Sequence, residues 1–431
     1  MITKTNLASC PDEYLTAFGL DPDKVIYFDI ETTGFRASTS SLYMIGWTVR
    51  INTVPYQARA VNTNSAPEHI RAVSTDSAIY QMNQADTKLH PDSSGFIEKS
   101  WLVTQMMAES ASEEALLLDH FRNIMARYGT IIEYNGDRFD LPYLRDKYEA
   151  YGMEDPFQHC RTVDLYHEIR PFKKELGLTK LNQKSVEKFL SITREDPYNG
   201  GELIDVYRSV RDGRIEGISE EESAVNALFL HNYEDVLGML AMTPLLAYPL
   251  AIQSNAAVTA IQTCTDPEMP VASYIWNKKD ALQSKSAGII EATFELPVPV
   301  PKPLHLTYEE YIDITLTDYH VKVILRPFSG SMYHFFPDYR NYYYLPEEDT
   351  AIHKSVASFV AASHREKAKA QSCYVKKQGT FLPLAGESKL PAFQRYYKDP
   401  VLWFEYIPDE KPDSAAFSEY IHRLIRDLVS G

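Results

Sequence analysis

The amino-acid sequence predicts an α/β fold, in which a mixed β-sheet is flanked by helices and a second, small α+β domain follows. Between residues 25 and 245, short apolar stretches of strand length alternate with longer segments whose apolar residues recur at helical spacing. Beyond Ile252, apolar and polar residues alternate instead, and a proline-rich connector occupies residues 297–303. We therefore predict one domain at residues 1–255, with an inserted segment at about residues 62–98, and a second at residues 256–431.

The composition limits the classes of protein to which the chain can belong. Its 431 residues include 43 lysines and arginines against 59 aspartates and glutamates, a formal net charge of -16. A protein that binds nucleic acid through bulk charge would be basic, so any such binding must depend on local basic patches or on metal ions. The four cysteines are far apart and form no C-x-x-C pair, which argues against a zinc site and for reduced thiols.

No segment of the sequence predicts a membrane protein or a secreted one. The N-terminus lacks the apolar core of a signal peptide. The longest apolar run, Leu237–Ile252, is short and contains Pro244 and Pro249, so we interpret it as a buried helix and its exit. We expect a cytoplasmic protein without a membrane span.

The first predicted strand, residues 25–30, begins the sheet and carries carboxylates. Its first four residues are apolar, which suits a strand that is buried on both faces. Asp29 and Glu31 are two residues apart, and because side chains alternate along a strand, both carboxylates leave the same face. They repel each other unless a cation lies between them, and their hard oxygen atoms suit Mg²⁺ or Mn²⁺. Two solvated carboxylates at a strand end are the alternative interpretation.

The next elements of the first domain follow in order along the chain. Residues 1–24 are interpreted as a polar lead-in, and Gly34 marks a turn after the first strand. Apolar composition predicts further strands at residues 41–49, 101–107, 130–134 and 160–165. Apolar residues at helical spacing predict a helix that follows Ser112 as its N-cap and ends at Gly129.

Residues 135–142, Asn-Gly-Asp-Arg-Phe-Asp-Leu-Pro, predict the start of another helix. Asp140 stands at the expected N-cap, Pro142 falls in the first turn, and Gly152 closes the helix. A capping role for Asp140 is at least as consistent with this pattern as a catalytic one.

The segment from Arg161 to Arg194 reverses the charge of the rest of the chain, with eight basic and four acidic residues. Lys180, Lys184 and Lys188 are spaced by four residues, which would place them on one helix face. Such a face is a candidate surface for phosphate groups. A solvated helix face with paired charges is an equally good interpretation.

A long helix is predicted at residues 221–242, and it places His231 and Asp235 one turn apart, so that both point the same way. A lone histidine on an apolar helix is more often a packed residue than a catalyst, but this one follows two acidic motifs. The ends of adjacent strands lie close in a mixed sheet, so the acids of the first strand, of residues 135–142 and of this helix can converge. Four carboxylates and one imidazole suffice for two divalent cations and a general base.

The second domain is predicted to be a separate α+β unit. Alternating patterns predict strands at residues 288–296, 311–317 and 321–326. Helices are predicted at residues 352–370 and 415–428.

Three motifs resemble those of the DEDD 3′→5′ exonucleases, which have the RNase H-like fold. The motifs are Asp29-Ile-Glu-Thr-Thr-Gly34, Asn135-Gly-Asp-Arg-Phe-Asp140 and His231-Asn-Tyr-Glu-Asp235. Within that group, the surrounding residues are most similar to bacterial YprB-type RNase H-like domains, over about residues 25–245. The sequence departs from the family in two ways. The spacing between His231 and Asp235 is the short spacing that is usual in family members with tyrosine in place of the histidine, and the inserted segment at about residues 62–98 has no counterpart.

The resemblance implies two-metal hydrolysis of phosphodiester bonds. Asp29 would bridge two divalent cations, Mg²⁺ or Mn²⁺. Glu31 and Asp235 would complete the site of the cation that activates water, and Asp140 would support the other. His231 would take the proton from the attacking water. The residues expected to contact nucleic acid are Thr32, Thr33 and Asn135 of the motifs, together with Lys180, Lys184 and Lys188 of the basic segment.

The resemblance also implies a substrate and a setting. The expected activity is 3′→5′ exonuclease action on DNA, with a single-stranded or 3′-ended substrate, in DNA repair or processing. A helicase or another repair protein is the expected partner. RNA is the alternative substrate, because nothing in the sequence distinguishes ribose from deoxyribose. A non-catalytic module that binds nucleic acid or protein is the alternative of a different class, although acids at all four positions argue against it.

Overall fold

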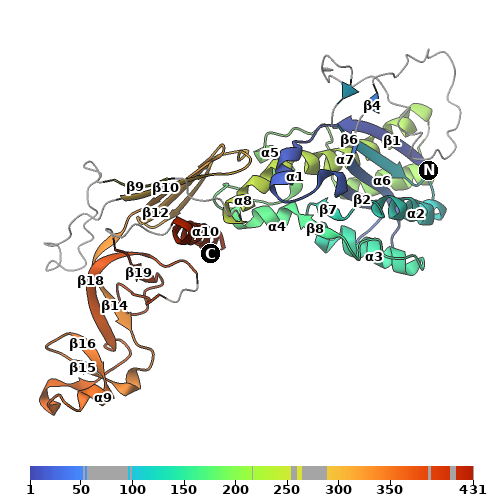
Figure 1. Cartoon of the computed structure of the whole chain (residues 1–431). Helices are drawn as coiled ribbons and strands as arrows, with labels where there is room; N and C mark the ends of the chain where they lie inside the picture. The colour runs from blue at the N-terminus through green and yellow to red at the C-terminus, as the bar shows by residue number, and fades with distance from the viewer. Residues whose placement is uncertain are drawn as a thin grey trace. The chain divides into compact units, whose positions relative to one another are not determined.

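The computed structural model describes residues 1–51, 54–55, 96–97, 100–215, 217–253, 260–264, 289–386, 390–407 and 414–430 (Figure 1). The chain divides into two compact units, Met1–Pro249 and Leu250–Gly431, and the division falls inside helix α8 (Ala247–Gln253). Apart from residues 96–97, the inserted segment predicted at about residues 62–98 lies outside the described residues.

The first unit is built on a mixed sheet with the strand order β1-β6-β3-β2-β7-β8. Its strands are β1 (Ile2–Ala8), β2 (Val25–Thr32), β3 (Leu42–Ile51), β6 (Ser100–Met107), β7 (Thr130–Glu133) and β8 (Arg161–Asp164). The strands β2, β7 and β8 run parallel, whereas the other neighbours are antiparallel. The predicted mixed sheet is confirmed, and β2 has the interior position that its apolar residues indicate. A short pair, β4 (Val54–Pro55) and β5 (Phe96–Ile97), stands apart from this sheet.

The polar lead-in predicted at residues 1–24 is wrong. Residues Ile2–Ala8 form β1, which pairs antiparallel with β6 along its whole length, and helix α1 (Asp12–Ala17) follows. Because β1 lies at the edge of the sheet, polar side chains such as Thr3 and Lys4 are tolerated there. Backbone pairing with β6 defines this strand, so its side-chain pattern carries little signal.

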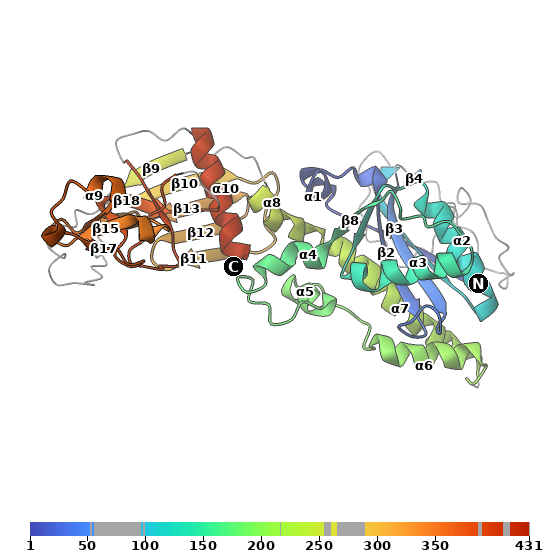
Figure 2. The ribbon, with the colours of Figure 1, turned by 90° about the horizontal axis from the view of Figure 1, so that it is seen from below.

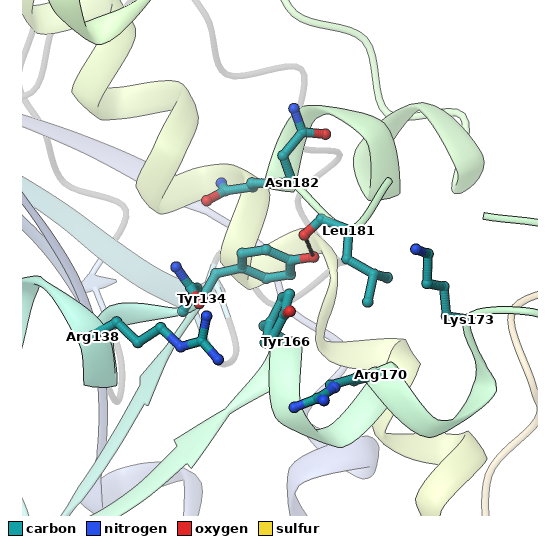
Figure 3. A pocket seen from close by; sticks show the side chains of 9 residues that line it. Tyr134, Arg138, Tyr166, Arg170, Lys173, Leu181 and Asn182 are labelled. Atoms are coloured by element: carbon teal, nitrogen blue, oxygen red, sulfur yellow. Dashed lines mark hydrogen bonds between the residues drawn. The ribbon is translucent and has the colours of Figure 1, made fainter. Parts of the chain in front are cut away.

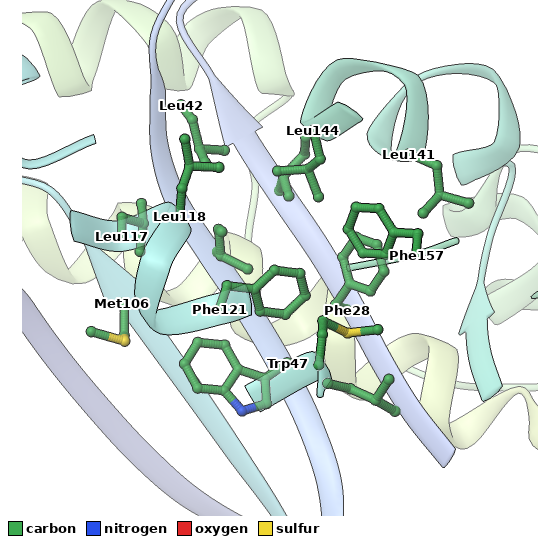
Figure 4. Close-up of a cluster of buried hydrophobic side chains, with 14 of the residues drawn as sticks. Phe28, Leu42, Trp47, Met106, Leu117, Leu118, Phe121, Leu141, Leu144 and Phe157 are labelled. Atoms are coloured by element: carbon green, nitrogen blue, oxygen red, sulfur yellow. The ribbon is translucent and has the colours of Figure 1, made fainter. Parts of the chain in front are cut away.

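Helices cover both faces of the sheet. They are α2 (Glu114–Met125), α3 (Asp140–Ala150), α4 (Leu165–Ile169), α5 (Gln183–Phe189), α6 (Gly200–Arg211) and α7 (Ile218–Ala241). On one face, Phe28 of β2 belongs to a buried cluster with Phe121 of α2 and Leu144 of α3 (Figure 4). On the other face, Tyr207 of α6 stacks on Tyr43 of β3 with ring centroids 4.0 Å apart.

The long helix of the first unit is a core element. The stretch Ile218–Gln253, which contains α7, is long and apolar enough to cross a membrane by length and composition, but 72% of its most apolar window is buried inside the structure. Helix α7 packs against β2, β3 and β6. Burial against the sheet explains its apolar character, as the sequence predicts for residues 221–242.

The second unit is rich in β-structure. An antiparallel sheet has the order β11-β12-β13-β10-β9, and its strands are β9 (Ala260–Cys264), β10 (Ile289–Glu295), β11 (Leu304–Tyr308), β12 (Ile312–Thr317) and β13 (His320–Leu325). Helix α10 (Ser414–Ser430) packs beside it, where His422 meets the ring of Phe294 edge-on (Figure 2). Two smaller sheets contain β14 (Phe328–Phe335), β18 (Tyr374–Pro383) and β19 (Trp403–Glu405), and β15 (Tyr342–Leu345), β16 (Thr350–His353) and β17 (Glu366–Lys367).

The helix predicted at residues 352–370 is wrong. Within that range the structure has only the four-residue helix α9 (Lys354–Ala357) and a 3₁₀ turn at Ala362–His364. Strand β16 overlaps its start and β17 lies near its end, and both pair with β15. Pairing with a strand outside the segment thus overrides its helical composition.

Candidate active site

Two carboxylates of β2 face helix α7. The amide nitrogen of Asn232 donates to Oδ2 of Asp29 at 3.0 Å, and Nε2 of His231 lies 3.7 Å from Oε1 of Glu31. Asp29 and Glu31 therefore leave the same face of the strand, as their spacing predicts.

Asn232 is itself held in place by the sheet. The side-chain amide of Gln105 donates to Oδ1 of Asn232 at 3.0 Å. A Cβ atom at Gly46, which pairs with Asp29 across the strands, would lie only 2.0 Å from the same oxygen. A glycine is needed at that position, because any side chain there would displace the amide that orients Asp29.

Helix α7 brings two further groups to the end of β2. Nε2 of His231 lies 3.2 Å from Oδ2 of Asp235, one helical turn away. One ligand atom from each of Glu31, His231 and Asp235 can be chosen so that all three lie within 4.8 Å of one another. The structure thus brings together these residues from two elements about 200 positions apart in the sequence.

Asp140 belongs to the same electrostatic group. It is the first residue of α3, and the N-cap position is occupied by Phe139, so the N-cap assignment from the sequence is wrong. The pKa of Asp140 is raised to about 7, mainly by burial and also by the negative charge of Asp235, although backbone N–H groups of Asp140 and Ile30 favour its carboxylate.

The acids of this group disfavour one another's ionisation. Burial is the largest cause that raises the pKa of Asp29 and of Glu31 well above the usual range, and the charge of Asp235 is the next. A divalent cation would reverse both effects. The donor set, four carboxylates and one imidazole, fits Mg²⁺ or Mn²⁺.

Sequence reasoning missed a buried partner of His231. Nδ1 of His231 lies 2.6 Å from Oδ2 of Asp196, whose side chain is fully buried. Burial alone would raise the pKa of Asp196, but the hydrogen bond with His231 is the largest of several effects that bring it below its usual value. Asp196 is therefore a carboxylate that can accept from Nδ1–H, and in that tautomer Nε2, which lies 3.2 Å from Oδ2 of Asp235, carries the lone pair of the ring.

Two backbone hydrogen bonds hold the segment that carries Asp196. The N–H groups of Glu195 and Asp196 donate to the carboxylate of Glu234 on α7, at 2.7 and 3.0 Å. Asp196 lies 35 residues before His231 and in neither a helix nor a strand, so no periodic pattern in the sequence could reveal it.

Arg194 is a second residue that the sequence analysis did not single out. Its Nη1 lies 2.6 Å from Oδ1 of Asp235, and its other nitrogens pair with the buried carboxylate of Glu187 on α5. These two acids raise the pKa of Arg194 despite its burial. The guanidinium offsets part of the negative charge of the site and leaves Oδ2 of Asp235 facing His231.

The predicted nucleic-acid contacts of the first and second motifs differ in their surroundings. The hydroxyl of Thr32 donates to the carbonyl of Gly34, and that of Thr33 accepts from the N–H of Ser41, so both close the turn after β2. Asn135 has a left-handed backbone, with φ of 59°, and its side chain lines an open hollow. Asn135 thus lines the hollow, whereas Thr32 is buried.

The predicted lysine face is wrong in part. Helix α5 begins at Gln183, so Lys180 lies outside it and cannot share a helix face with Lys184 and Lys188. The ammonium group of Lys184 donates to Oδ2 of Asp196 at 3.2 Å and to the carbonyl of Tyr198 at 2.7 Å. Lys184 therefore supports the loop of Asp196, while Lys180 and Lys188 are exposed.

A further buried acid lies at the end of β7. Glu133 is only 1% exposed, and burial raises its pKa to about 10, with a contribution from the neighbouring carboxylate of Asp137. The folded protein therefore holds a proton on Glu133 that the unfolded chain releases above about pH 4.3.

We expect Glu133→Gln to stabilise the metal-free protein at neutral pH. The contribution of Glu133 to stability falls as pH rises from about 4.3 to about 10, because only the unfolded chain gains the charged form in that window. At about 1.4 kcal/mol per pH unit, the upper limit of the gain is about 3 to 4 kcal/mol at pH 7. Melting temperatures in chelator across this pH range test it, with Glu149→Gln on the exposed side of α3 as control. Parallel curves for wild type and Glu133→Gln would contradict the assignment.

The fold and the acid group together define the class of protein. It has a mixed sheet, and β2, α3 and α7 carry the acids of a nuclease-type site. Comparison with known families supports this class. Residues 93–247 match the model of the RNase H superfamily, so this part of the chain is an RNase H-like domain. The match includes Asp140, His231 and Asp235 but begins after β2, and the structure joins Asp29 and Glu31 to them. The predicted RNase H-like fold is confirmed, and the narrower YprB-type resemblance stays a prediction.

Two individual proteins show limited similarity to the chain. A stretch of 67 residues is 36% identical to DNA polymerase 1 of Aeropyrum pernix, which is 16% of this chain and 7% of the polymerase. The structure of the family B DNA polymerase of Pyrobaculum calidifontis aligns with a TM-score of 0.33 and 14% identity, over 54% of this chain and 26% of that one. The chain therefore spans only a small part of either polymerase.

Proposed function

We propose that the RNase H-like unit is a divalent-cation-dependent 3′→5′ exonuclease that acts on DNA. The observation that carries this proposal is the convergence of acids from β2, α3 and α7 beside a histidine whose Nδ1 contacts the buried carboxylate of Asp196. Nuclease-type activity is also what the match to the RNase H superfamily supports.

The proposed cation ligands are Asp29, Glu31, Asp140 and Asp235. Two Mg²⁺ or Mn²⁺ ions held there would lower the pKa of water and neutralise charge that develops on the scissile phosphate. His231 accepts the proton of the attacking water at Nε2, while Asp196 holds the ring in the required tautomer. Asn232 and Arg194 orient Asp29 and Asp235 respectively.

The proposed substrate is single-stranded or 3′-ended DNA. Because the 67-residue match is to a DNA polymerase, we favour DNA over RNA as the substrate, although RNA would contact the same acidic residues. Two bound cations would also explain how a chain of net charge -16 holds a polyanion. The proposed setting is DNA repair in the cytoplasm, beside a helicase or another repair protein.

A time course on end-labelled single strands tests the proposal. With Mg²⁺ or Mn²⁺, 5′-labelled DNA should give a ladder that shortens one nucleotide at a time, and 3′-labelled DNA should release labelled mononucleotide at once. Chelator should stop both reactions. Matched RNA strands decide the sugar preference. An intact strand at all times, or a ladder that is unchanged by chelator, would contradict the proposal.

A further inference from the structure

An open hollow of about 590 Å³ lies beside the second motif (Figure 3). Its wall comes from three separate segments: the loop after β7, the α4 region with the following 3₁₀ turn, and the start of α5. The volume falls within the range of about 300–1,000 Å³ that is usual for small-molecule sites in proteins.

The hollow is positively charged. Arg138, Arg170 and Lys173 line it, and no carboxylate does. Among the described residues, none of these three side chains forms an ion pair with an acid. Three cations without acidic partners around one hollow, in a chain with an excess of acids, indicate a site for an anion.

The hollow also holds two aromatic rings. Tyr134 and Tyr166 meet edge to face with ring centroids 6.1 Å apart, and the guanidinium of Arg138 lies 5.8 Å from the centroid of Tyr166. The hydroxyl of Tyr134 donates to the carbonyl of Leu181 at 2.7 Å, which fixes the ring against the opposite wall. Aromatic rings next to unpaired cations are the combination that binds a nucleobase together with its phosphate.

One wall of the hollow is shared with the candidate active site. Gln183 lines the hollow, and its side-chain amide donates to the backbone carbonyl of Asp235 at 2.8 Å. Asn135, on another wall, stands five residues before Asp140 in the same motif. The hollow therefore shares one wall with a residue that contacts α7 at Asp235, and another with the motif that contains Asp140.

We propose that this hollow binds one nucleotide unit of the single-stranded substrate, next to the nucleotide that is cleaved. The cations Arg138, Arg170 and Lys173 receive its phosphates, and its base packs against Tyr134 and Tyr166. A base can reach these recessed rings only when it is unpaired, so the hollow selects single strands over duplex. This inference rests on the proposed nuclease function for the identity of the ligand.

The test is the affinity of the full chain for a fluorescent single-stranded oligonucleotide, in chelator so that no hydrolysis occurs. For Arg170→Gln/Lys173→Gln we expect about a tenfold loss of affinity at low salt. The slope of log affinity against log salt should become shallower by about 1.4, because two phosphate contacts are lost at about 0.7 each for single strands. Tyr166→Leu should lose roughly tenfold with an unchanged salt slope, because stacking does not depend on counterions.

The matched control is Lys24→Gln/Arg127→Gln. These two exposed cations belong to the same unit but precede strands β2 and β7. The hollow lies at the opposite end of β7, where Tyr134 and Asn135 follow the strand. Melting temperatures establish that each variant is folded. Unchanged affinity and slope in both hollow variants, or an equal loss in the control, would overturn the inference. Equal affinity of wild type for duplex and single strand would also overturn it.

The binding test can fail or succeed independently of the cleavage test of the proposed function. If wild type cleaves DNA but the hollow variants bind as wild type does, the inference fails and the nuclease function stands. If wild type cleaves nothing but the hollow variants lose affinity and salt slope, the nuclease function fails and the single-strand site stands.

Discussion

Asp29→Asn is expected to lower the rate of DNA cleavage by about 10³-fold or more while leaving the fold intact. Asparagine has the same shape but no charge, so it removes the carboxylate that is proposed to bind both cations. Several kcal/mol of charge stabilisation in the transition state correspond to a loss of this size. Rates are measured on 5′-labelled single strands with Mn²⁺.

The same substitution should raise the melting temperature of the protein in chelator. The pKa of Asp29 is raised by burial and by its acidic neighbours, so ionising it costs stability when no cation is present. Asp205→Asn, at an exposed position on α6, is the control and should change neither the rate nor the melting temperature. Cleavage by a folded Asp29→Asn protein at the wild-type rate would exclude the assigned site.

His231→Gln is expected to lower the rate by about 10² to 10⁴, the usual contribution of a general base. Asp196→Asn should cost a similar factor, because an amide can donate to Nδ1 and would then place the imidazole proton on Nε2, the atom that must accept. The double variant should be little slower than either single variant, because both changes disable the same His231–Asp196 pair. Single-turnover rates across pH measure all three.

Binding of Mn²⁺ and of DNA separates this role from a structural one. A base and its positioning partner should change the rate and the pH profile while both affinities stay near wild type. Wild-type rates with an unaltered pH profile in His231→Gln and in Asp196→Asn would remove the imidazole from the mechanism.

The first unit could largely be predicted because its central elements obey simple periodic patterns. The apolar run before Asp29 reflects a strand that is buried inside the sheet, and the helical spacing around His231 reflects a helix that packs one face against that sheet. The two acids of β2 and the pair on α7 follow from these patterns, since strand and helix geometry dictate which way their side chains point.

The residues that support the acids could not be found in this way. Asp196 and Arg194 lie in an irregular segment, and their contacts with α7 join positions more than 30 residues apart. The cationic hollow is built from three segments that are separate in the sequence, and neither Arg170 nor Tyr166 shares a sequence motif with Asn135. In the second unit, strand pairing with β15 decides the structure of a segment whose composition is helical.

The proposed nuclease requires that the acids at the end of β2 bind divalent cations. The most direct test is to titrate Mn²⁺ into wild type and into Asp29→Asn and to follow free Mn²⁺ by electron paramagnetic resonance. A chain with so many surface acids will bind some Mn²⁺ weakly in both proteins, so the difference between them is the signal. We expect tight Mn²⁺ binding in wild type that is lost in Asp29→Asn. Identical Mn²⁺ binding by the two proteins would contradict it.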